Sequence, residues 1–291
     1  MNKFTGLTYI KSIIQGLTVL AALSVGTPAL AANVSTSTTK AKRPAAPAPT
    51  PEAKAWSLDL SVESYSNMMK EDSYERDAQT SVDLSAGYRF NKITSMRIGT
   101  GVIKEHVGPE NTYFDNTSAS LSFKTQLAQD IAWINTLAGI LPTNRQMQDE
   151  MSYQGAARIG TKIAFNNLIW GSSASTGVQL TRSFHEYEMT ADGSYNMRNN
   201  AQLALTYTLP LFSKLALQTS YSYTVGWTYQ DDTRNKFSVG ADLGWDFTPS
   251  VSAWIGTSNQ GNALKANGID SNIEFFNDTT SIVKAGFTIS I

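Results

Sequence analysis

Charged residues recur at alternate positions in several short segments of the chain, a spacing that lets them act together. Side chains two residues apart on an extended segment project from the same face, so each segment can carry charge on one side. The candidates are acidic Asp59, Glu63, Asp83, Asp242 and Asp246, basic Arg97, Lys124, Arg158 and Lys162, and Arg89 and Lys284, which lie among or beside the acidic segments. Such rows provide electrostatic guidance of a solute and not bond-breaking chemistry.

Catalytic chemistry has fewer candidates. The chain contains 2 histidines, His106 and His185, and neither has a serine two positions later. A metal site at His185 would lack a second nearby histidine. A hydrolytic site would have to combine His185 with the carboxylates of Glu186, Glu188, Asp231 or Asp232. Acidic residues are expected in polar connecting segments in any case, so we predict no enzyme, no metal site and no cofactor.

The charged candidates lie on segments with a period of two. The clearest runs from Phe237 to Thr257, where FSVGADLGWDF and VSAWIGT alternate apolar with small or polar residues around Pro249 and Ser250. This pattern indicates a β-hairpin with one apolar face. The residues between 131 and 141 are apolar on both faces, which leaves their phase open. We predict about twelve strands, at residues 56–64, 81–90, 96–103, 118–127, 131–141, 153–165, 168–180, 201–209, 215–227, 237–247, 251–257 and 281–291.

The connections between these strands alternate in length. Short turns lie near residues 91, 129, 167, 212 and 249, and longer polar loops join the other neighbours. Barrels that span a membrane have this alternation of short turns and long loops. The predicted fold class is therefore all-β, a single transmembrane antiparallel up-and-down β-barrel over residues 55–291. An even strand number puts both barrel termini on the short-turn side.

Composition and aromatic placement agree with a barrel. The chain is 41% hydrophobic and 16% charged, yet has no long apolar run after residue 25. Aromatic residues gather near both ends of the predicted strands, as two membrane interfaces select. Trp133 and Trp254 instead fall on the polar face, which indicates a bulge or a wrong phase there. A net charge of -1 gives no field to attract nucleic acid, and the absence of cysteine excludes disulfides.

The first part of the chain predicts export. Lys3 and Lys11 precede an apolar stretch at residues 13–25, and Ala29-Leu30-Ala31 provides a cleavage site. Residues 1–31 therefore have the pattern of a signal peptide. Residues 32–54 are rich in Pro and Ala and predict an extended periplasmic linker.

Over residues 55–291 the chain resembles bacterial outer-membrane β-barrel proteins. The last strand, KAGFTISI, is similar to their C-terminal assembly signal, although it ends in Ile291 and not in an aromatic residue. The resemblance implies outer-membrane localisation, with lipid, lipopolysaccharide and the outer-membrane assembly machinery as partners. Members with twelve strands include nucleoside channels, oligosaccharide channels and a phospholipase, and no motif assigns this chain to one of them.

A twelve-stranded barrel is roughly 24 Å across, between side-chain-filled and wide-open barrels. The predicted inner face carries mainly small residues, so we expect water in the lumen and the charged candidates along a pore. Acidic and basic strands would then face each other and orient small polar or zwitterionic solutes during passive passage. The alternatives are cross-lumen salt bridges that plug a structural barrel, external loops at residues 67–78 and 183–199 that contact other surfaces, and a hydrolase at the rim.

Overall fold

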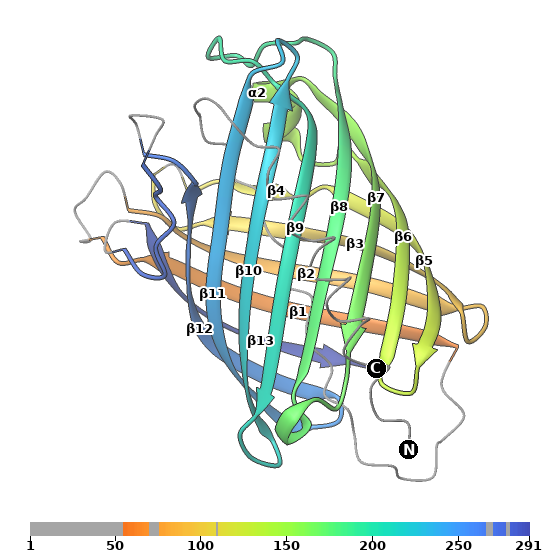
Figure 1. Ribbon diagram of the computed structural model, residues 1–291. Helices are drawn as coiled ribbons and strands as arrows, with labels where there is room; N and C mark the ends of the chain where they lie inside the picture. Colours follow the sequence, from red (N-terminus) through yellow and green to blue (C-terminus); the bar gives the residue numbers. More distant parts are fainter. Residues whose placement is uncertain (1–54, 70–75, 109, 266–269, 278–279) are drawn as a thin grey trace.

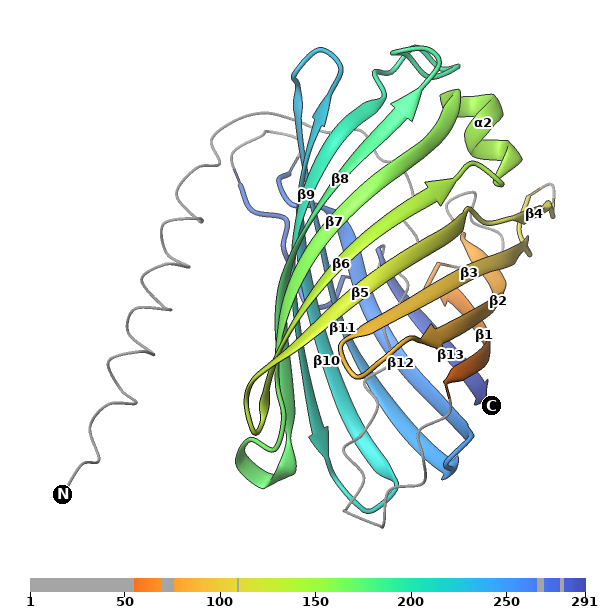
Figure 2. The ribbon, with the colours of Figure 1, turned by 90° about the vertical axis from the view of Figure 1, so that its right-hand side faces the viewer.

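The computed structural model describes residues 55–69, 76–108, 110–265, 270–277 and 280–291. The predicted signal peptide and linker, residues 1–31 and 32–54, lie outside the described residues. Figures 1 and 2 show the described chain as a barrel in two side views.

The described strands form one antiparallel sheet of thirteen strands, which closes on itself. Twelve of them make a ring, because β1 pairs with β13 as well as with β2, and β2 pairs with β3. At the closure Leu58 and Ile291 exchange two backbone hydrogen bonds, of 3.2 and 2.9 Å. The strands are β1 (Trp56–Asn67), β2 (Ala78–Arg89), β3 (Thr94–Glu105), β4 (Thr112–Phe114), β5 (Thr117–Ala128), β6 (Ile131–Leu141), β7 (Tyr153–Phe165), β8 (Ser173–His185), β9 (Met197–Pro210), β10 (Leu215–Thr228), β11 (Thr233–Thr248), β12 (Val251–Asn262) and β13 (Ser281–Ser290). The predicted closed barrel of about twelve strands is confirmed.

The extra strand β4 extends the wall at the long-loop end. Val102 of β3 pairs with Phe114 of β4, and Gly99 pairs with Ser118 of β5. β4 and β5 thus follow one another along β3, separated by the short segment Asp115–Asn116. The alternation had indicated only a loop before residue 118.

The barrel has its apolar side chains outside. Leu84, Ile159 and Ile255 are exposed, although a soluble protein would bury them. Cross-strand pairs lie on the same face of a sheet, and the pairing Leu84↔Thr100 and Ile159↔Leu180 continues this apolar face from strand to strand. Lipid is the environment that such a surface requires.

Several strand bounds differ from the predicted ones, and two of these differences change a connection. Residues Ile169–Gly171 form the 3₁₀ turn η1, with Trp170 at φ 59°, so β8 begins at Ser173 and not at residue 168. β11 begins at Thr233, four residues before the predicted start, and leaves a short β10–β11 turn. Both differences arise because the alternation near a strand end does not show where pairing stops.

A short helix, α2 (Arg145–Met151), lies in the connection between β6 and β7, at the upper end in Figure 1. It begins where the Asn144 side chain accepts a hydrogen bond of 3.0 Å from the Met147 amide and ends at Ser152, which has left-handed backbone angles. Among the described residues, helices are all too short or too polar to span a bilayer.

The strand register also shows which face of the wall Trp133 and Trp254 occupy. The register of β5 with β6 shifts between Gln126 and Ala128, next to the turn. Beyond this shift Thr125 pairs with Trp133, and both residues lie on the outward face. The inward phase of Trp133 was therefore wrong. Trp254 pairs with Gly244 and Gly286 on the inward face, without a shift at that position.

Candidate functional site

The inner wall carries the charged residues that alternation selected. The strand register places the following set on the inward face: Asp59, Glu63, Asp83, Arg89, Arg97, Lys124, Arg158, Lys162, Asp242, Asp246 and Lys284. Arg89 and Asp246 lie at the short-turn ends of β2 and β11 and are exposed. The role of the set in solute passage remains a prediction.

Two inner acids have a basic partner on the same wall. Arg97 of β3 forms an ion pair with Asp59 of β1, and its guanidinium also donates to the Ser85 hydroxyl on the strand between them. The Arg97 side chain is 56% exposed, so the pair lies in water. Because β3 and β1 are two strands apart, this ion pair runs along the wall and does not cross the lumen.

The second pair is buried. Lys284 Nζ of β13 lies 3.0 Å from Asp242 Oδ1 and 3.2 Å from Asp242 Oδ2, and the Lys284 side chain is 5% exposed. The same Nζ lies 5.1 Å from the ring centroid of Trp254 on the intervening strand β12. A cation is stabilised by both the carboxylate and the ring face. Lys284 therefore belongs to a wall-side cluster with Asp242 and Trp254.

Glycines opposite three inward side chains let those side chains lie flat. A Cβ atom added to Gly101 would come within 2.5 Å of Asp83 Oδ1, and one added to Gly286 within 2.7 Å of Trp254 Cζ2. Asp242 lies over Gly256 in the same way. Side chains that lie along the wall occupy less of the lumen than side chains that project toward its axis.

The basic residues lie on another arc. Lys124 of β5 and Lys162 of β7 both pair with Ile134 of β6, so they lie at the same level two strands apart. Arg158 lies further along β7 and donates a hydrogen bond of 3.3 Å to Thr181 Oγ1. Among the described residues, neither Lys124 nor Lys162 has an ion-pair partner.

Two basic residues of this face were missed from the sequence. Arg234 and Lys236 precede Ser238 and Asp242 on β11 with the same phase, which directs them inward. Extending the alternation of residues 237–247 backwards by two steps would have found both. The inward face of β11 is thus basic near its long-loop end and acidic toward its short-turn end.

The candidate rim histidine, His185, has aromatic neighbours. His185 lies between the rings of Tyr153 and Tyr229, at centroid distances of 5.6 and 5.8 Å. Its Nδ1 is 3.5 Å from the Tyr229 hydroxyl. Within the described chain, no hydrogen bond or ion pair joins His185 to a carboxylate, and no three His, Asp or Glu side chains gather as a metal site.

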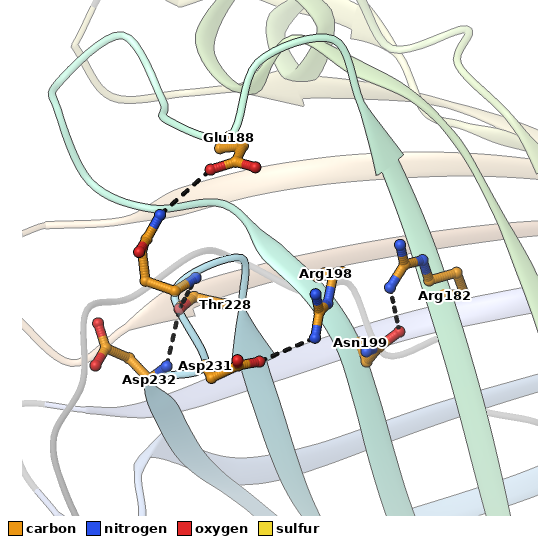
Figure 3. Close-up of polar contacts among 8 residues, drawn as sticks. Arg182, Glu188, Arg198, Asn199, Thr228, Asp231 and Asp232 are labelled. Carbon is orange, nitrogen blue, oxygen red and sulfur yellow. Dashed lines mark hydrogen bonds and ion pairs between the residues drawn. The ribbon is translucent and has the colours of Figure 1, made fainter.

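The rim carboxylates have other contacts, which join the β8–β9 and β10–β11 connections (Figure 3). Asp231 Oδ1 accepts a hydrogen bond of 2.9 Å from Arg198, and Glu188 accepts one of 3.3 Å from Gln230. The Asp232 amide donates to Thr228 Oγ1 at 3.1 Å. This network positions the tip of the long β10–β11 hairpin.

The chain is similar to known proteins in structure, and no relative was found by sequence. No family model matches the chain, and no curated protein matches it. The NanC porin superposes with a TM-score of 0.53 at 7% identity, covering 80% of this chain and 98% of that one. An outer-membrane channel from Pseudomonas putida F1 superposes with a TM-score of 0.55 at 10% identity, covering 85% and 100%. With its closed ring, apolar exterior and polar interior, the chain is a porin-like β-barrel with the fold of outer-membrane channels.

Proposed function

We propose that this protein is a narrow passive channel of the outer membrane for small polar or zwitterionic solutes. The observation that carries the proposal is the separation of charge on the inner wall. In the ring, β5 with Lys124 lies six strands from β11 with the exposed Asp246, and β7 with Lys162 lies six strands from β13, beside the acidic strand β1. A dipolar solute between such walls is aligned across the channel.

An open lumen is supported by the geometry of the inner side chains. The ion pairs of Arg97 and Lys284 each connect strands two apart, so neither bridges the barrel. Asp83, Asp242 and Trp254 lie over glycines of neighbouring strands. We therefore favour the channel over the plugged structural barrel, and we place the short turns and both barrel termini in the periplasm. Lipid and lipopolysaccharide would surround the apolar outer face.

Single-channel recording tests this function. Purified mature protein inserted into a planar lipid bilayer is expected to give discrete conductance steps of uniform size, because one barrel contains one water-filled path. The control is the same preparation after heat denaturation, which removes the barrel. Silence from folded protein that has inserted into the bilayer would contradict the channel and favour a structural barrel.

A further inference from the structure

A groove of about 400 Å³ crosses the outside of the wall from β8 to β11. Thr176, Leu205, Tyr221 and Val239 follow one another across these four strands as cross-strand partners. They share the outward face with the exposed apolar residues. The residues that line the groove include Thr176, Leu205, Tyr207, Tyr221, Val239 and Phe275.

One side of the groove comes from the connection between β12 and β13. Asn259 lies on the outward face of β12 but is 1% exposed, because this connection covers it. Its Nδ2 donates a hydrogen bond of 2.8 Å to the Glu274 carbonyl, and its Oδ1 accepts one of 2.6 Å from Thr280. Part of the connection lies beyond the left edge of the wall in Figure 2. The next residue after Glu274, Phe275, is thereby held over the groove.

The depth of the groove in the membrane follows from the irregular backbone of the β12–β13 connection beside it. Irregular backbone is not exposed to the hydrocarbon core of a bilayer. The connection over Asn259 therefore marks the outer boundary of that core. From Val239 beside this boundary the groove runs toward Thr176, which lies three residues from the short-turn end of β8. It thus begins at the level of the outer head groups and descends into the membrane.

The dimensions suit one hydrocarbon chain. Four neighbouring strands span about 14 Å at roughly 4.8 Å per interval. Because barrel strands tilt by roughly 40° from the membrane normal, this path descends about 9 Å, which lies within the ~15 Å depth of one leaflet. Water is absent at this surface, so retention of a lipid depends on close packing, which the rings of Tyr207, Tyr221 and Phe275 provide.

We propose that this groove binds one acyl chain of an outer-leaflet lipid, lipopolysaccharide in a bacterial outer membrane, with Phe275 as its side wall. The groove is continuous with the lipid-facing surface of the barrel, and most of its exposed lining is apolar. The proposal rests on the outer-membrane location and is independent of whether the lumen conducts.

Phe275→Ala tests the site, with Phe276→Ala as the matched control. The two residues are adjacent and similarly exposed, at 59% and 53%, but Phe276 does not line the groove. Each refolded protein is incubated in mild detergent with purified lipopolysaccharide or, separately, with phosphatidylethanolamine. Bound lipid is then counted by native mass spectrometry after gel filtration, and folding is verified by circular dichroism.

Wild type and Phe276→Ala are expected to retain about one lipopolysaccharide per barrel, and Phe275→Ala at least fivefold less. Equal retention by all three proteins, or equal loss from both variants, would overturn the proposal. Retention of phosphatidylethanolamine alone would overturn the assignment to the outer leaflet. A dimer mass that only Phe275→Ala abolishes, without bound lipid, would show that a second copy fills the groove instead.

Discussion

Asp242→Ala is expected to lower the free energy of unfolding by about 3–5 kcal/mol, because it leaves the Lys284 ammonium buried without its carboxylate. Lys284 is 5% exposed, and the Trp254 ring lies beside its Nζ. Equilibrium urea unfolding in lipid vesicles, followed by tryptophan fluorescence, measures the change.

Asp59→Ala is the matched control for that variant. It also removes an aspartate from an inner-wall ion pair, but its partner Arg97 is 56% exposed, so the expected loss is below about 1 kcal/mol. Asp242→Ala combined with Lys284→Met should recover much of the loss, since the buried charge is then absent. Equal losses from the two single variants, or no recovery in the double variant, would show that the buried pair does not stabilise the wall as described.

Arg158→Gln combined with Lys162→Gln is expected to reduce the anion-to-cation permeability ratio roughly tenfold at low salt. Two charges roughly 10 Å from a permeating ion contribute about 0.8 kcal/mol in water, with opposite signs for anion and cation. The effect should shrink as ionic strength rises, because the Debye length is about 10 Å at 0.1 M. Reversal potentials in asymmetric KCl measure the ratio.

Arg182→Gln is the control for selectivity. Arg182 is also basic and pairs with Ala157 next to Arg158, but its register directs it outward, and its Nη1 donates to Asn199 at 3.1 Å. Its loss should leave the reversal potential unchanged. If the double variant of Arg158 and Lys162 has the reversal potential of wild type, those residues do not line the ion path. If Arg182→Gln shifts the reversal potential as much as the double variant does, the shift reflects general surface charge.

Much of the inner wall could be predicted because strand geometry is local. Side chains alternate between the two faces, so the polar phase around Asp83 or Lys162 shows which residues share a face. Alternation gives no prediction of the phase where the contrast between polar and apolar faces is missing or ends. Residues 131–141 are apolar on both faces, and only the pairing of Thr125 with Trp133 decides their phase. Arg234 and Lys236 were missed because the strand start was placed too late.

Period-two alternation by itself determined that this chain forms a β-barrel with an apolar exterior and a charged interior, because the two faces of each strand meet different solvents. Only the tertiary structure decided which charges pair. Asp242 and Lys284 are far apart in sequence and meet because of strand order and stagger, with Trp254 between them. It also folded the β12–β13 connection against the outer wall, through hydrogen bonds of Asn259 that no alternation encodes.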